Sequence, residues 1–186
     1  YLNNIIYSSD YMLNLVNNLL DVSKIEAGKL VLKLNTFDIV EFIRKNIYLN
    51  KFIANKKNIT IFFEPVLEPV NVVADSNQIG QVLSNLLSNA IKFSEKGKNI
   101  EVLITIEDKF VKVSVKDSGQ GIPEKELIKL FKPFSKTSVA STDGEHNTGL
   151  GLAIVKKIIE QHTGMVSVES EVNVGSVFSF TLPLSE

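Results

Sequence analysis

Two neighbouring segments of alternating apolar and polar residues, 100–107 and 111–117, constrain the fold most strongly. A two-residue period is typical of β-strands with one buried face, and the short link between the segments predicts an antiparallel hairpin. Helical periodicity appears at 38–55, 76–93 and 150–162, each with an apolar face that must be covered. We therefore predict a two-layer α/β sandwich: one mixed, largely antiparallel sheet with the helices on one face.

Shorter patterns predict the elements between these segments. Strands are expected at 58–63, 70–74, 165–170 and 176–182, and a short helix at 123–131. Residues 135–147 are rich in Ser, Thr, Asp and Gly, which predicts a mobile loop.

Residues 1–27 form a helical pattern with a wide apolar stripe, and Gly28 is a natural stop. A stripe of this width favours a helix that packs into a bundle, although a helix docked on its own domain is the alternative. We therefore divide the chain into a helical segment, 1–30, and a main domain, 31–186.

Composition excludes several classes of protein. The chain has 186 residues, with no cysteine and two histidines, which excludes disulfides, thiolate zinc sites and cysteine nucleophiles and argues against a multi-histidine metal site. Its 20 Lys and Arg against 21 Asp and Glu lack the basic excess that non-specific nucleic-acid binding requires. No apolar run approaches the ~20 residues that span a bilayer. We expect a cytoplasmic piece of a longer protein, without nucleic-acid or direct membrane contact, whose parent can still be membrane-anchored.

The helix expected at 76–93 has an unusual polar face. Asn85, Ser88, Asn89 and Lys92 lie there, where a solvated face would favour Glu, Lys and Arg. Asn85 and Asn89 are four residues apart and therefore project from one stripe. Amide oxygens can ligate Mg²⁺ without adding negative charge beside a phosphate chain, and Lys92 follows one turn later. The alternative is a set of ordinary exposed polar residues.

The turn Asp117-Ser-Gly119-Gln-Gly121 comes directly after an expected strand. Its glycines let the backbone approach a ligand closely. A carboxylate at the strand end can accept a hydrogen bond from the amine of adenine, which guanine lacks at that position. The alternative is a glycine turn with a capping aspartate.

The sequence Thr148-Gly-Leu-Gly-Leu152 opens an expected helix after the mobile loop. Free N–H groups at a helix N-terminus bind anions, and the glycines remove side-chain obstruction. This is not the dinucleotide-binding fingerprint, because Ile154 stands where the third glycine is required, and it is not a P-loop. The alternative is a glycine-rich helix start.

The order and spacing of these motifs resemble those of sensor histidine kinases. Residues 85–93 are similar to the asparagine box of that family, 117–121 to the first glycine box, 130–134 to the phenylalanine box, and 148–152 to the second glycine box. Residues 19–28 resemble the end of the second helix of the dimerisation and phosphotransfer domain. The resemblance covers essentially the whole chain.

The resemblance implies the Bergerat ATP-binding fold of the GHKL superfamily, with ATP and Mg²⁺ as cofactors. Asn89 would be a magnesium ligand, and Lys92 would contact phosphate. Asn85, beside the reacting phosphate, and Lys136, as a basic residue that contacts phosphate, would be the catalytic side chains. Asp117 would read the adenine amine. The other nucleotide-binding residues implied, including the lid anchors Phe131 and Phe134, are Phe93, Gly119, Gly121, Ile122, Phe131, Phe134, Thr148, Gly149, Leu150, Gly151 and Leu152.

The chain departs from the family pattern in three places. Asn147 stands where the second glycine box usually begins with glycine, and residues 75–78 lack a frequent arginine. The helix that carries the phosphoacceptor histidine is absent, and neither His146 nor His162 has the right neighbours. The chain is therefore expected to be a protein histidine kinase fragment that cannot phosphorylate itself.

The implied function is transfer of the ATP γ-phosphoryl group to a histidine on a missing dimerisation helix, for relay to a response-regulator receiver domain. The intact protein would be a homodimer. The alternative is a non-catalytic nucleotide-binding regulatory module of the same fold. An anti-sigma-factor or mitochondrial-type protein kinase fits less well, because residues 19–28 resemble sensor kinases.

Overall fold

The structure is a computed structural model that describes residues 31–65, 68–145 and 147–185, together with single positions before residue 31. The helix expected at 1–27, with its motif at 19–28, lies largely outside the described residues, and His146 lies outside them as well.

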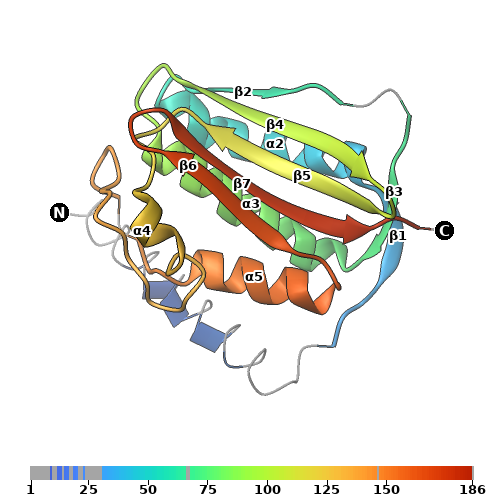
Figure 1. Cartoon of the computed structure of the whole chain (residues 1–186). Coiled ribbons are helices and arrows are strands. Elements are labelled where there is room, and N and C mark those ends of the chain that lie inside the picture. Colours follow the sequence, from blue (N-terminus) through green and yellow to red (C-terminus); the bar gives the residue numbers. More distant parts are fainter. Residues whose placement is uncertain are drawn as a thin grey trace.

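A five-stranded sheet forms one layer, with the strand order β2-β4-β5-β7-β6. Its strands are β2 (Thr60–Phe63), β4 (Asn99–Glu107), β5 (Phe110–Asp117), β6 (Val166–Glu171) and β7 (Gly175–Pro183). β2 runs parallel to β4, and the other neighbours are antiparallel. The β4–β5 hairpin turns at Asp108, which adopts a left-handed backbone conformation. The prediction of a mixed, largely antiparallel sheet is confirmed (Figure 1).

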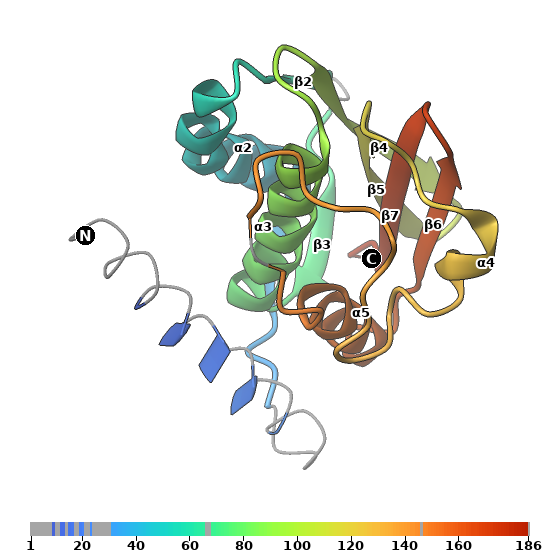
Figure 2. The ribbon, with the colours of Figure 1, turned by 90° about the vertical axis from the view of Figure 1, so that its left-hand side faces the viewer.

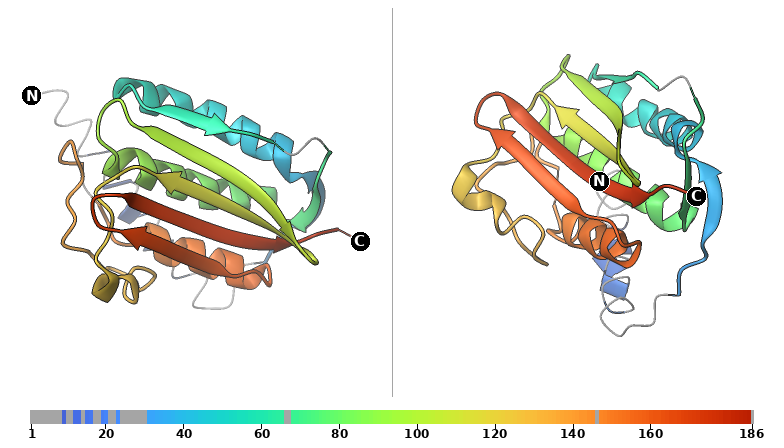
Figure 3. Two further views of the ribbon diagram at one scale, coloured as in Figure 1. Left: turned by 45° about the horizontal axis from the view of Figure 1, so that its top comes forward. Right: turned by 45° about the vertical axis from the view of Figure 1, so that its right-hand side comes forward.

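Three helices cover one face of this sheet: α2 (Ile39–Lys56), α3 (Ser76–Phe93) and α5 (Gly151–Gln161). Figure 3 (left) shows them side by side behind the strands, with α3 in the middle. The core between the layers is mainly aliphatic, with Ile79, Leu83 and Val113 fully buried, and it includes the buried ring of Phe180. The predicted two-layer α/β sandwich is therefore confirmed.

Two expectations about local structure are corrected. The helix expected at 123–131 is only α4 (Glu124–Leu127), because the backbone beyond it continues in tight turns with i→i+3 hydrogen bonds. The strand expected at 70–74 exists as β3 (Asn71–Ala74), but it pairs with an unexpected strand, β1 (Asn35–Asp38), in a separate two-stranded sheet.

Aspartates at the N-termini of α2 and α3 fix where these helices begin. Asp38 accepts a hydrogen bond from the Val40 N–H (3.0 Å), and Asp75 accepts from the N–H groups of Asn77 and Gln78 (3.0 and 3.3 Å). Such caps satisfy donors that have no partner within the helix. The buried residues of α3 are all apolar, whereas Asn85 and Asn89 are only half-buried.

The segment 135–147, hereafter the lid, has no regular secondary structure in its described part. It runs from the region after α4, past the end of α3, to the start of α5 (Figure 2). None of the described helices is long and apolar enough to cross a bilayer.

Candidate nucleotide site

A cavity of about 690 Å³ opens between α3, the lid, the start of α5 and the edge of the sheet where β5 ends and β7 begins. Its lining is mixed, with amides and hydroxyls on one wall and apolar side chains on another. A cavity of this size is large enough for a nucleotide. The lining residues to which the sequence analysis assigns a role in binding or catalysis are Asn85, Asn89, Lys92, Phe93, Asp117, Gly121, Ile122, Lys136, Thr148, Gly149, Gly151 and Leu152.

The polar part of the wall contributed by α3 consists of Asn85, Asn89 and Lys92, together with Ser84 and Ser88. The Nδ2 atom of Asn85 is buried and has no hydrogen-bond partner among the described residues. A buried donor without a partner is costly, and an acceptor such as a phosphate oxygen would relieve that cost. This wall therefore offers amide groups, hydroxyls and one cation to a ligand.

Asp117, at the last position of β5, lines the cavity near the C-terminal end of α3, because Gly119, which bonds to its carboxylate, lies against the Phe93 carbonyl. Burial raises the pKa of its carboxyl to about 6, against the lowering effect of hydrogen bonds from the backbone of Gly119 and Ser176. The Gly119 N–H donates to Oδ1 at 2.9 Å. Gly119 does not line the cavity, and it acts on the site by holding this carboxylate in place.

Two glycines adopt conformations that side chains disfavour, at points where the backbone is also crowded. Gly121 has φ +68°, and a Cβ there would meet the backbone carbonyl of Glu171. Gly149 has φ +71°, and a Cβ there would lie 2.7 Å from the carbonyl oxygen of Ser135. Both positions therefore require glycine, and both line the cavity.

The N-terminus of α5 faces the cavity through Gly151 and Leu152. In contrast to α2 and α3, it has no side-chain cap, and only the Leu150 N–H just before it bonds to Thr148 Oγ1 (3.2 Å). Its first N–H groups therefore remain available to an anion. A Cβ at Gly151 would lie 3.1 Å from Asn85 Oδ1, so the bare backbone lets α5 approach the α3 wall.

The lid closes the remaining side with Lys136 and Glu145. Burial lowers the pKa of the neighbouring Lys92, while the charge of Glu145 raises it and that of Lys57 lowers it. Burial alone would raise the pKa of Glu145, but hydrogen bonds from Lys57 and the backbone hold it below its ordinary value. This part of the cavity thus contains the side chains of Lys92 and Lys136 together with the Glu145 carboxylate.

Residues 74–186 match the family model described as histidine kinase-, DNA gyrase B-, and HSP90-like ATPase. The chain belongs to this family.

The relatives of this ATPase domain include hybrid signal transduction histidine kinase B of Dictyostelium discoideum, which is 40% identical over 98% of the chain. The crystal structure of full-length ShkA in complex with AMPPNP matches with a TM-score of 0.84 and 30% identity over 100% of the chain. The histidine kinase ThkA in complex with the response regulator protein TrrA matches with a TM-score of 0.77 and 32% identity, also over 100%. These matches confirm the Bergerat fold.

The chain spans only part of each relative: 10% of the Dictyostelium kinase, 38% of ShkA and 51% of ThkA.

Four residues that the resemblance assigns to nucleotide binding do not line the cavity of this ATPase domain: Gly119, Leu150, Phe131 and Phe134. Leu150 is fully buried in the core, and the half-buried Phe131 packs against that core. Phe134 is 62% exposed at a left-handed position, so its side chain does not anchor the lid; its backbone instead packs against Gly149.

Sequence reasoning missed several residues that line the cavity. Ser176 and Phe178 belong to β7, where the strand pattern gave no sign of a site. Glu145 and its lid neighbours lie in a polar loop whose path depends on tertiary contacts. Asn147, noted only as a departure from the family pattern, also lines the cavity.

His162 does not have the accessible environment that a phosphoacceptor needs. It is 4% exposed at the end of α5; its Nε2 accepts from the Asp75 N–H (3.0 Å), and its Nδ1 lies 2.8 Å from the Ile158 carbonyl oxygen. An Nε2 that accepts carries no proton, so Nδ1 is the donor and the ring is neutral. His162 therefore joins α5 to the start of α3.

Proposed function

We propose that this chain binds ATP with Mg²⁺ and is the catalytic and ATP-binding domain of a sensor histidine kinase. The carrying observation is that one cavity holds a buried carboxylate, Asp117, together with the asparagine wall of α3 and the uncapped start of α5. A carboxylate suits the amine of adenine, and the asparagine wall with the helix start suits a phosphate chain.

Each side chain has a defined role in this proposal. Asp117 accepts from the adenine amine, and Asn85 donates through its unpaired Nδ2 to the reacting phosphate. Lys92 and Lys136 neutralise phosphate charge from the two sides of the cavity. The first N–H groups of α5 bind further phosphate oxygens. Catalysis then comes from positioning and charge neutralisation.

Magnesium binding is proposed to depend on the nucleotide. No group of three His, Cys, Asp or Glu side chains in the described part of the chain could hold a metal ion. Asn89 supplies one amide oxygen at the cavity wall, so the remaining ligands would be phosphate oxygens and water. The bound ion would neutralise charge that develops on the phosphates.

The proposed acceptor is a histidine outside this chain. His162 is buried with both ring nitrogens engaged, and the relatives are much longer than this chain. We propose that residues 1–30 belong to the dimerisation domain of a homodimeric parent and residues 31–186 to the catalytic domain. A response-regulator receiver domain would then receive the phosphoryl group, as the ThkA–TrrA complex suggests.

Calorimetric titration tests the nucleotide site. ADP and a non-hydrolysable ATP analogue should bind, more tightly with Mg²⁺, and GTP should not. Kinase activity is then tested by adding a dimerisation domain that carries the acceptor histidine, with labelled ATP. Label on the added domain and none on this chain is the expected result. Nucleotide binding without any transfer would instead support the non-catalytic regulatory module.

A further inference from the structure

Lys57 is a buried cation that the nucleotide site does not explain. It follows directly after α2, is 5% exposed, and does not line the cavity. Burying an ammonium group is costly unless hydrogen bonds and opposite charges surround it. The partners that meet this cost come from two other parts of the chain.

The first partners belong to the last turn of α3. Lys57 Nζ donates to the carbonyl oxygens of Ile91 (3.1 Å) and Lys92 (3.3 Å). Carbonyl groups at a helix C-terminus carry partial negative charge and have no partner within the helix. Lys57 therefore caps the end of the helix that carries the asparagine wall.

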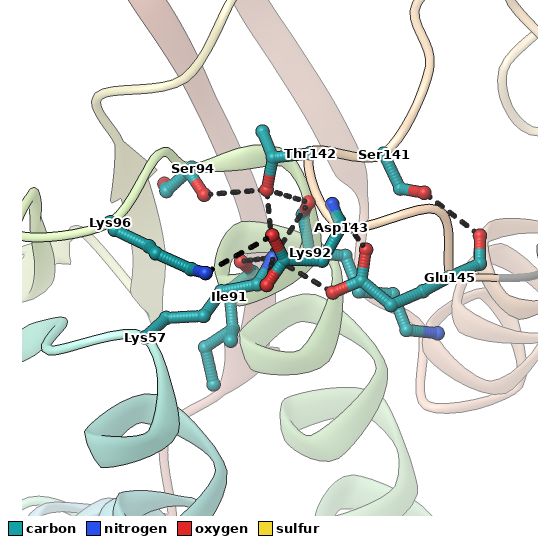
Figure 4. Close-up of polar contacts among 9 residues, drawn as sticks. All are labelled: Lys57, Ile91, Lys92, Ser94, Lys96, Ser141, Thr142, Asp143 and Glu145. Atoms are coloured by element: carbon teal, nitrogen blue, oxygen red, sulfur yellow. Dashed lines mark hydrogen bonds and ion pairs between the residues drawn. The ribbon is translucent and has the colours of Figure 1, made fainter.

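The second partners belong to the lid, as Figure 4 shows. Lys57 Nζ lies 2.7 Å from Glu145 Oε1, 2.8 Å from Thr142 Oγ1 and 3.9 Å from Asp143 Oδ2. The Thr142 N–H also donates to the Lys92 carbonyl oxygen at 3.1 Å. One ammonium group thus joins the lid to the end of α3.

The position of Lys57 also determines which cation pairs with the Glu145 carboxylate. Glu145 and Lys92 both line the cavity, and their charges influence each other. If Lys57 were absent, the Glu145 carboxylate would lack its closest cation, would attract Lys92 and would repel a phosphate chain. With Lys57 beside it, Glu145 is compensated from outside the cavity.

We propose that Lys57 is a positioning residue of the nucleotide site: it fastens the lid to α3 and compensates Glu145, which leaves Lys92 free for phosphate. This inference rests on the proposed function, since it assumes that phosphates bind beside Lys92. It concerns ligands with a triphosphate or diphosphate chain and not the adenine end of the cavity.

The test compares ATP with adenosine, which lacks phosphates, in Lys57→Met. Loss of one charge-assisted contact predicts a roughly tenfold weaker affinity for ATP, while adenosine affinity should change by less than about twofold. Hydrogen exchange of the lid amides, that of Thr142 among them, should become faster. Lys45→Met is the matched control, because Lys45 is an exposed α2 lysine whose ion pair is with Glu41 at 3.8 Å.

A second substitution separates charge compensation from simple structural damage. Adding Glu145→Gln to Lys57→Met removes the uncompensated carboxylate, so ATP affinity should recover to within about threefold of the unmodified chain. If Lys57→Met does not fold, Lys57→Gln, which keeps a donor for the α3 carbonyls, replaces it with the same expectations.

Three results would overturn the inference: unchanged ATP affinity in Lys57→Met, equal losses for ATP and adenosine, or no recovery with Glu145→Gln. An unmodified chain that binds no ATP would overturn the proposed function, and this inference with it. An unmodified chain that binds ATP while Lys57→Met behaves like Lys45→Met would overturn the inference alone.

Discussion

Asp117→Asn should raise the stability of the ligand-free chain while weakening its binding of adenine nucleotides. The carboxyl is 6% exposed, and burial raises its pKa from 3.8 to about 6. The folded chain therefore holds this proton more tightly than the unfolded chain. Stability is highest when the carboxyl is protonated, falls as pH rises from about 4 to about 6, and stays lower above that.

The size of this effect follows from the shift. A change of about 2 pKa units corresponds to about 3 kcal/mol of destabilisation at neutral pH. Asparagine avoids this cost but gives the backbone N–H groups of Gly119 and Ser176 one acceptor oxygen in place of two, a loss of about 1 kcal/mol. We expect a net gain of about 2 kcal/mol at pH 7.5, or roughly 4–8 °C in melting temperature.

The nucleotide affinity should move in the opposite direction. Replacing a charged acceptor by an amide should weaken ADP binding by about 1.5–3 kcal/mol, roughly 10- to 150-fold. Binding to the unmodified chain should also weaken as the pH falls through about 6, since Asp117 takes up a proton there. The Asn variant should lack this dependence.

Thermal melts at pH 7.5 and pH 4, with calorimetric titrations of ADP, measure both effects. Asp108→Asn is the matched control, because Asp108 is an exposed aspartate in the β4–β5 turn. Destabilisation of Asp117→Asn at pH 7.5 would refute the assigned cost of the buried charge. Unchanged ADP affinity would refute the adenine-reading role.

Three further substitutions, with Gly97→Ala as the control for Gly121→Ala, test other parts of the structure. Asn89→Ala should remove the Mg²⁺-dependent part of nucleotide binding, and titrations with and without Mg²⁺ that still differ as before would contradict the ligand role. Gly121→Ala should destabilise the chain by about 2 kcal/mol or more in chemical denaturation, because φ is +68° and the Glu171 carbonyl blocks a Cβ. Gly97→Ala should cost only about 1 kcal/mol, since Gly97 shares the positive φ and has open space around it. His162→Leu should cost about 1–3 kcal/mol by leaving the Asp75 N–H unpaired. It should nevertheless transfer phosphoryl to an added acceptor domain at 25 °C, and a folded but inactive variant would contradict its structural role.

The sequence predicted the elements whose own periodicity defines them. Helix α3 begins and ends at the residues that its apolar pattern predicted. The β4–β5 hairpin was equally predictable, because apolar and polar residues alternate in its two strands and the strands are adjacent in the chain. In each case the signal is local, so the neighbouring residues contain enough information to fix the element.

Elements that depend on distant partners could not be predicted from the sequence. Strand β1 has only four residues and becomes a strand by pairing with β3, whose residues lie far along the chain. The four-residue α4 is shorter than expected because nothing in its sequence marks the change to tight turns after Leu127. Tertiary context decided both outcomes.

The same distinction applies to the cavity. Asp117 and the asparagines of α3 could be proposed because their residue types are unusual for a strand end and a helix face. Lys57 could not be proposed in this way, because it follows Lys56 and the pair resembles ordinary lysines exposed to solvent. Its role exists only once the lid, more than eighty residues later, folds back onto α3.

The features that mark this cavity share one physical property: each costs stability in the absence of a ligand. Asn85 has an unpaired buried donor, Asp117 a buried charge, and α5 an uncapped N-terminus. Elsewhere the same chain caps α2 and α3 and pairs the buried Lys57 completely. Among the described residues, Ser94 and Gln161 also hold buried atoms without a partner, outside the cavity, but the unpaired amide, the buried carboxylate and the uncapped start of α5 all meet at one cavity. Such a concentration of unmet hydrogen-bonding and electrostatic needs is expected where a ligand supplies the missing partners.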